Sequence, residues 1–312
     1  MAKISKRSNR SLRKIIIIIS ILLFISITIN IIIYLKTNSY KNNYNNMIEQ
    51  LNSITSSKEE KEKEYQKVSE RLDLVNNIDE RTNEVKKDFF TKAKQLEDKI
   101  IAGKSNEKIV YITFDDGPYY LTYQFLEILD EYDVFATFFT IGDNKDVCYD
   151  NRSEDCSGMY ALEASKGHTM ANHTYSHGIW KGLYDSPESF MYQVKLQENL
   201  IKDRTGIKTN IVRFPGGAAT AGGYKNRIIE LLRENGYGWI NWTASIGDGG
   251  SLRDYDIGWN NFVNNISANI EVLLQHDYNR VTLRLLPEEI KYLKEHGYHI
   301  FPLFYESNMV NK

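Results

Sequence analysis

The residue types in this chain that could do chemistry follow short β-rich runs in its second half. Asp115, Asp116, Gly117 and Pro118 come directly after the run at 108–114. Two adjacent carboxylates on a Gly-Pro turn are costly to hold together unless a cation or an arginine lies nearby. The pair therefore indicates a cation-binding turn, although Asp-Gly is also common in ordinary turns.

Two histidines, His173 and His177, follow the run at 168–172. Their i, i+4 spacing would place both imidazoles on one face if a helix begins there. Two histidines and one carboxylate are a common ligand set for catalytic zinc, which leaves a coordination position open for water. The alternative is two ordinary histidines on a surface helix.

Three further polar residues lie at or just after the ends of other runs. Arg213 lies in the run at 210–214, Asp248 follows the run at 237–243, and His276 ends the run at 270–276. Each position alone is weak support for a site. Taken together, five polar elements each follow a separate predicted strand, and in β/α folds chemistry gathers at the carboxyl ends of the strands. The sequence thus predicts one shared site.

The elements that must position these residues alternate in type along residues 107–312. Seven β-rich runs lie at 108–114, 134–141, 168–172, 210–214, 237–243, 270–276 and 298–305. Helical patterns lie between them at 121–132, 186–206, 224–238 and 286–298. Repeated β-then-α units predict a parallel sheet with helices outside. Seven strands in this length fit a barrel smaller than the eightfold one.

Residues before about 106 have a different composition. All 5 prolines and all 6 histidines lie after that point, and only Gly103 of the 19 glycines lies before it. A stretch with almost no turn residues cannot fold back often. It is predicted to be mostly long helix.

The N-terminal part predicts a membrane anchor. Residues 1–14 form a basic tail with six Lys/Arg and no acid, and residues 15–35 form an uncharged segment in which 17 of 21 residues are apolar. About 20 residues span the hydrocarbon core of a bilayer, and basic flanks stay in the cytoplasm. We expect a single-pass cell-membrane protein whose catalytic domain is extracellular and whose N-terminal helix contacts membrane lipid. A cleaved signal peptide is the alternative, but no small-x-small cleavage site follows.

Residues 36–106 are polar and carry 14 Lys/Arg and 13 Asp/Glu. Apolar side chains recur near a 3.5 spacing, at Tyr65, Leu72, Val75, Phe89, Ala93, Leu96 and Ile100. This pattern favours a helical, coiled-coil stalk that could self-associate. A solvated single helix or a partly disordered linker is the alternative. Cys148 and Cys156 would fit a short-loop disulfide outside a cell, or two free thiols. A net charge of −2 gives no nucleic-acid signal.

Five motifs in this order resemble those of the NodB-type polysaccharide deacetylases, carbohydrate esterase family 4. They are TFDDG (113–117), GHTMANHTYSH (167–177), RFPGG (213–217), WTASIGD (242–248) and LLQH (273–276). The resemblance covers roughly residues 107–305. It implies a distorted (β/α)7 barrel for a catalytic domain at 107–312. The anchor and spacer also look like those of peptidoglycan deacetylases of Gram-positive bacteria.

The resemblance implies a role for each motif residue. Asp116, His173 and His177 would be the ligands of Zn2+, or of another divalent metal such as Co2+ or Mn2+. Asp115 would be the general base, held by Arg213, which is expected to lower the pKa of Asp115. Asp248 would orient His276, the general acid. Gly216, Pro215 and Trp242 would contact the oxyanion or the substrate.

Two positions depart from the family pattern. Relatives often carry Tyr where this chain has Gly216, and Trp where it has Gly249. The first change removes a side-chain contact to the sugar, and the second removes a wall of the pocket.

The leading functional hypothesis is metal-dependent hydrolysis of the N-acetyl group of N-acetylglucosamine in peptidoglycan, which releases acetate and leaves glucosamine. An alternative is the same chemistry on an exopolysaccharide or on N-acetylmuramic acid. A hypothesis of a different class is an inactive, anchored glycan-binding module. The presence of both Asp115 and His276 favours an enzyme.

Overall fold

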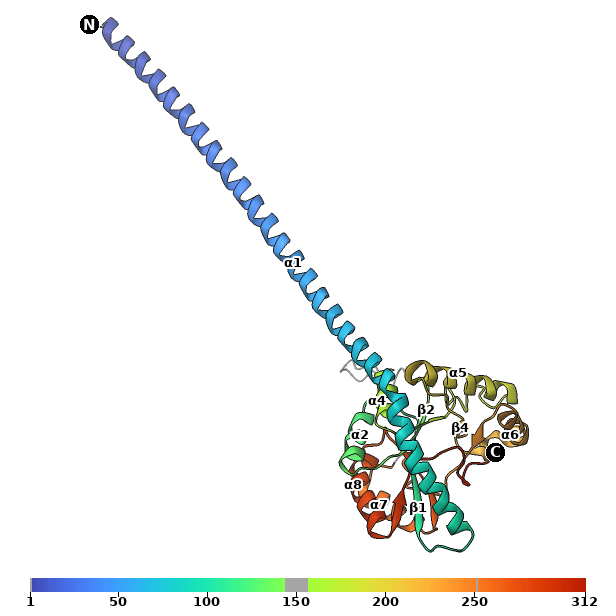
Figure 1. Cartoon of the computed structure of the whole chain (residues 1–312). Coiled ribbons are helices and arrows are strands. Elements are labelled where there is room, and N and C mark those ends of the chain that lie inside the picture. The colour runs from blue at the N-terminus through green and yellow to red at the C-terminus, as the bar shows by residue number, and fades with distance from the viewer. Residues whose placement is uncertain (1, 144–156, 251) are drawn as a thin grey trace. The chain divides into compact units, whose positions relative to one another are not determined.

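The computed structural model describes residues 2–143, 157–250 and 252–312. The chain divides into two compact units, one up to Ser69 and one from Glu70 to Lys312. The first element, α1 (Ala2–Ile101), is a single helix, as the scarcity of turn residues predicts (Figure 1). The predicted pair of Cys148 and Cys156 lies outside the described residues.

The first unit contains the apolar part of α1. The segment Ile19–Ser56 is long and apolar enough to cross a membrane, with a mean hydropathy of 2.2 in its most apolar window. The described apolar side chains of this segment, such as Leu22, Leu23 and Phe24, are exposed in the isolated chain. This composition fits a membrane anchor or a signal sequence. The predicted division into a tail, an anchor at 15–35 and a stalk at 36–106 stays a prediction.

The second unit is built on a parallel sheet. Its strands are β1 (Lys108–Asp115), β2 (Thr137–Thr140), β3 (Thr169–Asn172), β4 (Ile211–Val212), β5 (Gly238–Trp239), β6 (Ala244–Ser245), β7 (Ile270–His276) and β8 (Tyr298–Ile300). Seven of them follow the order β5-β4-β3-β2-β1-β7-β6, and β8 pairs with the start of β1. All these ladders are parallel. The curled half-barrel confirms the predicted distorted (β/α)7 class.

Helices form a layer on the outside of this sheet. They are α2 (Thr122–Glu131), α4 (Ser157–Ser165), α5 (Pro187–Thr205), α6 (Lys225–Glu234), α7 (Tyr255–Asn265) and α8 (Arg280–Glu295), with a 3-10 turn η1 (Ala218–Tyr224). Neighbours in this layer pack in the order α7, α8, α2, α4, α5, α6 (Figure 1). Because the paired strands are parallel, their carboxyl ends converge at one end of the sheet.

Alternation along the strands divides the core into two faces. On β1, Val110, Ile112 and Phe114 pack outward against the helices, in one cluster with Phe125 of α2 and Leu285 of α8. The intervening residues point to the inner face because successive side chains of a strand alternate. Ile109 and Tyr111 accordingly belong to a second cluster that fills the half-barrel.

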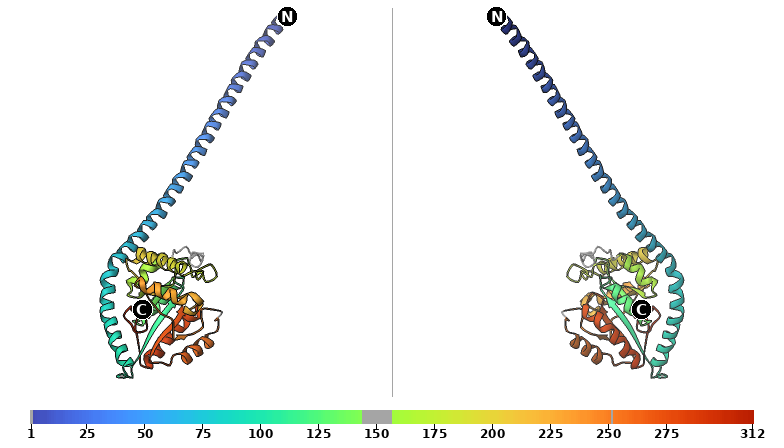
Figure 2. Two further views of the ribbon diagram at one scale, coloured as in Figure 1. Left: turned by 90° about the vertical axis from the view of Figure 1, so that its right-hand side faces the viewer. Right: turned by 90° about the vertical axis from the view of Figure 1, so that its left-hand side faces the viewer.

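The last turns of α1 cover this inner face, beside β1 (Figure 2). Ala93 and Leu96 are buried there, and Phe90 stacks on Phe304 with ring centroids 5.0 Å apart. Glu97 is fully buried and accepts hydrogen bonds from the Tyr111 hydroxyl (2.5 Å) and the Ser307 hydroxyl (2.6 Å). The compact unit therefore includes residues before 107.

The predicted strands correspond to β1–β5, β7 and β8, mostly with shorter bounds. The strand β6 was not expected, because the predicted run at 237–243 ends just before it. The helices α4 and α7 were also not among the predicted ranges. Ala244 and Ser245 carry too little β-branched or aromatic character for a sequence pattern to mark two residues as a strand.

Candidate active site

The inner face of the sheet carries the predicted chemical residues at its carboxyl end. Asp115 ends β1 on the face of Ile109 and Tyr111, and His276 ends β7 on the face of Val272. Arg213 follows β4 two residues after Ile211, which belongs to the inner-face cluster, so both side chains lie on the inner face. The period of two therefore brings residues far apart in sequence to one mouth of the half-barrel.

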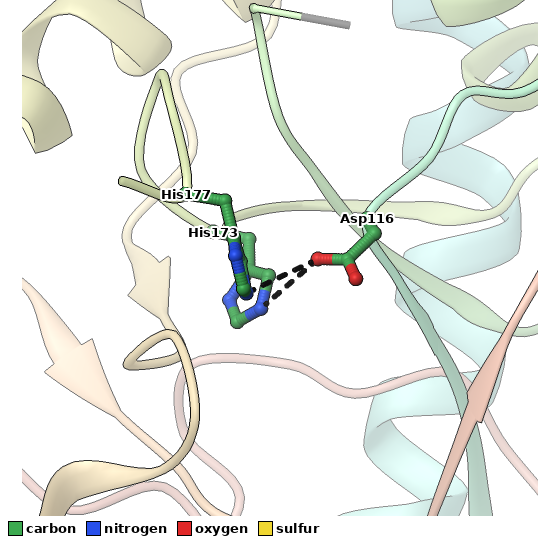
Figure 3. Close-up of side chains that lie close together, drawn as sticks. All are labelled: Asp116, His173 and His177. Atoms are coloured by element: carbon green, nitrogen blue, oxygen red, sulfur yellow. Dashed lines mark ion pairs between the residues drawn. The ribbon is translucent and has the colours of Figure 1, made fainter. Parts of the chain in front are cut away.

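Asp116, His173 and His177 form a compact triad (Figure 3). The Asp116 Oδ1 atom lies 3.5 Å from His173 Nε2 and 3.4 Å from His177 Nε2. The three ligand atoms all lie within 4.8 Å of one another. One oxygen and two nitrogen donors converging at this spacing are the ligand set of a divalent metal centre.

The two histidines are not on a helix, contrary to the helical reading of their i, i+4 spacing. His173 follows β3, and the chain then makes a tight turn in which Thr174 has φ 65° and His177 has φ 48°. Asp116 also has a left-handed backbone, with φ 72°. Such conformations each cost on the order of 1–3 kcal/mol in non-glycine residues and cluster at functional sites. The Asn172 amide supports the turn by accepting from Thr174 N–H at 2.9 Å.

The residues fit a metal ion. Asp116 Oδ1 is buried and has no hydrogen-bond partner in the described part of the chain. The free-energy cost of burying this oxygen is therefore not offset by a hydrogen bond, as it would be by a bound cation. His173 Nδ1 lies 2.9 Å from the Arg213 carbonyl oxygen, which can only accept, so Nδ1 carries the hydrogen and Nε2 presents its lone pair. Burial lowers the pKa of His173 to about 3, which keeps the imidazole neutral.

Asp115 is paired with Arg213. The Arg213 Nη1 donates to Asp115 Oδ1 at 2.8 Å and to Thr113 Oγ1 at 2.7 Å. Both side chains are almost fully buried. Burial raises the pKa of Asp115, and the charge of Arg213 opposes that rise without cancelling it. The expectation of a lowered pKa is therefore wrong in its net direction, because desolvation outweighs the ion pair.

Asp248 holds His276 through both its ring and its backbone N–H. Its Oδ1 lies 2.9 Å from His276 Nδ1, and its Oδ2 accepts from the His276 N–H at 2.7 Å and from the Thr282 hydroxyl at 2.6 Å. Burial lowers the pKa of His276, but the hydrogen bond and charge of Asp248 more than offset this and raise it to about 9. The ring therefore carries a proton at neutral pH.

The structure shows the surroundings of Gly216 and Gly249, the two positions that depart from the family pattern. Gly216 is exposed with φ 69°, and the neighbouring Pro215 is buried. A Cβ at Gly249 would lie 2.6 Å from His276 Cε1, so the imidazole occupies the space where a side chain would begin. Trp242 packs over Gly217, whose Cβ would be 3.2 Å from the indole. The predicted roles of Pro215, Gly216 and Trp242 toward the oxyanion or the substrate stay predictions.

Sequence reasoning assigned no role to three residues beside the site. The Tyr278 ring lies 5.1 Å from that of His276, and the Tyr119 ring lies 6.1 Å from that of Tyr278. Asp277 is fully buried, accepts from the Thr122 hydroxyl, and fills the space beneath Gly117. Their signal was their place within two residues of the ends of the first and fifth motifs.

The half-barrel and its triad, with a buried carboxylate and a protonated histidine beside it, define a metal-dependent hydrolase. The family model for polysaccharide deacetylase matches residues 102–240. The chain belongs to the polysaccharide deacetylase family, carbohydrate esterase family 4, and is a hydrolase of amide C–N bonds that acts on an N-acetylated polysaccharide.

Similar proteins include two named peptidoglycan-N-acetylglucosamine deacetylases of Bacillus cereus. One is 28% identical over 208 residues, which cover 64% of this chain and 71% of the relative. The other is 32% identical over 203 residues, covering 62% of this chain and 85% of the relative. The solved catalytic domain of peptidoglycan N-acetylglucosamine deacetylase from Eubacterium rectale is 30% identical, with a TM-score of 0.60, and covers 66% of this chain and 93% of that domain.

Proposed function

We propose that this protein removes the N-acetyl group of N-acetylglucosamine in peptidoglycan, with zinc held by Asp116, His173 and His177. The observation that carries the proposal is that a carboxylate and a protonated histidine both lie next to the triad. Asp115 Oδ2 lies 3.5 Å from His173 Nε2, and His276 Nε2 lies 3.8 Å from Asp116 Oδ2. A buried base and a protonated acid flanking one metal centre suit amide hydrolysis.

Each side chain has a distinct task in this proposal. A bound divalent metal supplies Lewis acidity and favours deprotonation of water. Asp115 accepts the proton of the attacking water, and Arg213 fixes the orientation of its carboxylate. The Gly216 N–H donates to the developing oxyanion of the carbonyl. His276 Nε2 donates a proton to the departing amine as the C–N bond breaks, so the products are acetate and a free amine.

Two features favour peptidoglycan as the polymer. The named relatives act on peptidoglycan N-acetylglucosamine by their printed names. The long apolar segment of α1 would hold the domain at a membrane, and its basic flank favours an extracellular domain. An enzyme held there would meet cell-wall glycan first.

The alternative of an inactive glycan-binding module is less well supported. Such a module has no need to keep Arg213 fully buried against Asp115, or Asp248 fully buried against His276. Buried charges cost free energy unless they are paired and hydrogen-bonded. Both pairs are retained here with hydrogen bonds of 2.8 and 2.9 Å.

The test is mass spectrometry of acetate loss from purified wall glycan and from chito-oligomers, with the full chain in detergent micelles and zinc supplied. We expect a loss of one acetyl group per N-acetylglucosamine acted on, and a rate lower by about 10² to 10⁴ with Asp115→Asn. Acetate release from neither glycan would overturn the proposed function. Release from N-acetylmuramic acid alone, or from an exopolysaccharide alone, would establish the alternative substrate.

A further inference from the structure

A cleft with a basic lining opens beside the candidate active site. Its volume is about 580 Å³, and its lining residues are Tyr119, Arg253, Tyr278, Asn279, Arg280, Val281 and Arg284. Three of these seven are arginines and none is acidic. The surrounding domain, by contrast, has 19 Lys/Arg against 28 Asp/Glu over residues 107–312. The cleft is therefore a local positive patch on an acidic domain.

Two tyrosines connect this cleft to the catalytic groups. Tyr278 contacts the ring of His276 at a centroid distance of 5.1 Å, and Tyr119 contacts Tyr278 at 6.1 Å. Tyr119 also lies three residues after Asp116 in the chain. A polymer with one sugar at the triad would therefore continue directly into the cleft.

The charges of the three arginines are not neutralised within the described part of the chain, where no carboxylate lies at ion-pair distance from them. Arg280 Nη2 donates to the Tyr120 hydroxyl at 2.8 Å, Arg253 Nη1 donates to the Leu252 carbonyl at 2.8 Å, and Arg284 lies 5.1 Å from the Tyr255 ring. All three side chains are exposed. These contacts orient the guanidinium groups and leave further N–H donors available.

Two nearby carboxylates accept hydrogen bonds from other groups. Asp254 Oδ1 accepts from Ile257 N–H at 3.0 Å as the N-cap of α7, and Glu288 accepts from the Tyr255 hydroxyl at 2.6 Å. The 16-residue helix α8 also begins in the cleft, with Asn279 as its N-cap. The positive end of a helix dipole adds to the attraction for an anion.

We propose that this cleft binds a carboxylate carried by the glycan next to the sugar that is deacetylated, so that the enzyme selects an acidic polymer. This inference rests on the proposed function and specifies its substrate class. Peptidoglycan carries carboxylates on the lactyl ether of muramic acid and on its stem peptides, whereas chitin-type polymers carry none. The planar guanidinium group pairs with a carboxylate through two parallel hydrogen bonds, which suits this recognition.

The experiment compares kcat/KM for acetate release by the zinc-loaded full chain on four substrates. These are wall glycan with stem peptides, glycan freed of its peptides, the same peptide-free glycan with methyl-esterified carboxyls, and neutral chito-oligomers. We expect the wild type to prefer the free-acid glycan over its ester by roughly tenfold or more, through a lower KM. Added salt should reduce this preference, because exposed charges are screened.

The variant Arg253→Gln/Arg280→Gln/Arg284→Gln should lower the acid-to-ester ratio of kcat/KM by roughly tenfold. The matched control is Arg227→Gln, which removes the charge of an exposed arginine on α6 that is paired with Glu230 at 3.0 Å. That control should keep the ratio of the wild type. If the triple variant unfolds, the single variant Arg253→Gln, in the loop before α7, replaces it and should lower the ratio in the same direction.

The outcomes separate this inference from the proposed function. Equal rates on the peptide-bearing, free-acid and esterified glycans, or an unchanged substrate preference in the triple variant, would overturn carboxylate binding by the cleft while leaving the deacetylase activity intact. A preference that requires the stem peptides assigns the carboxylate to the peptide, and one that survives their removal assigns it to the lactyl group. If no glycan is deacetylated, calorimetry that compares the binding of free-acid and esterified glycan tests whether the cleft recognises a carboxylate, independently of activity.

Discussion

Asp115 and His276 are register partners at the ends of two adjacent parallel strands, Asp115 on β1 and His276 on β7. Each side chain is held by a buried partner of opposite charge from another segment, Arg213 for Asp115 and Asp248 for His276. The proposed base and acid are therefore fixed by strand pairing and not by a mobile loop. Catalytic groups on rigid elements keep their geometry better than groups on loops.

The first prediction concerns Asp115. Asp115→Asn should reduce turnover by about 10² to 10⁴, because removing a positioned acid or base typically costs that much. Metal content should be retained, because Asp115 lies outside the triad of Asp116, His173 and His177. Acetate release and metal analysis of the same sample check both parts. Loss of metal together with activity would show that Asp115 is a ligand.

The second prediction separates the acid from the base. His276→Ala should lose the proton donated to the leaving amine, and an aryl acetate ester should recover part of its rate because an aryloxide leaves without protonation. Asp115→Asn should not recover on the ester, since activation of water is still impaired. Parallel rates of both variants on amide and ester substrates measure this. Equal losses on both substrates would contradict the division of roles.

The third prediction concerns pH. His276 must be protonated to act as the acid, and its pKa is raised to about 9 against the lowering effect of burial, chiefly by Asp248. Activity should therefore persist below about pH 9 and fall as the pH rises through it. Asp248→Asn removes the carboxylate that favours the imidazolium, so the alkaline limb should move to lower pH. The pH profile of kcat checks this, with Asp254→Asn, at an exposed N-cap, as the control.

Several parts of the site could be predicted from sequence because they follow from position along strands. The carboxyl ends of parallel strands meet at one end of a sheet, whichever strands pair. The predicted residues lie at such ends, after the runs at 108–114 and 168–172 and in the last positions of the runs at 210–214 and 270–276. This convergence predicted a carboxylate beside His173 and His177, whereas the choice of Asp116 over Asp115 came from the resemblance to the family. The strand order β5-β4-β3-β2-β1-β7-β6 was not predicted, since periodicity carries no information on which strands pair.

Other parts depend on contacts that local patterns do not encode. The apolar stripe that includes Phe89, Ala93 and Leu96 was expected in a coiled-coil stalk, but these side chains pack into the inner core of their own domain. A stripe of this kind looks the same whether it faces another helix or a sheet. The net pKa of Asp115 was misjudged for a similar reason, because the extent of its burial is a property of the assembled fold.

The fourth prediction concerns the metal. The double variant His173→Ala/His177→Ala should lose the divalent ion and keep its fold, because the triad lies at the mouth of the half-barrel and outside its hydrophobic clusters. Elemental analysis and circular dichroism check the two parts. The matched control His296→Ala/His299→Ala, at exposed positions, should keep the metal. Full metal occupancy in the first variant would refute the ligand assignment.

The fifth prediction concerns the end of α1. Glu97→Ala should lower the free energy of unfolding of the second unit by at least about 2 kcal/mol, because buried donors left without an acceptor cost about 1–3 kcal/mol each. Those donors are the hydroxyls of Tyr111 and Ser307 and the N–H of Asn308, which donates to Glu97 at 2.8 Å. Thermal unfolding followed by near-ultraviolet circular dichroism should show a lower midpoint.

The matched control for this last prediction is Glu49→Ala, which removes an exposed carboxylate from the same helix in the first unit. It should leave the midpoint unchanged, because an exposed glutamate loses no buried partner. If both variants unfolded at the temperature of the wild type, the buried contacts of Glu97 would not stabilise the domain. A lower midpoint for Glu97→Ala alone would show that the domain uses the end of its own N-terminal helix as part of its core, so that α1 cannot be separated from it at residue 107 without loss of stability.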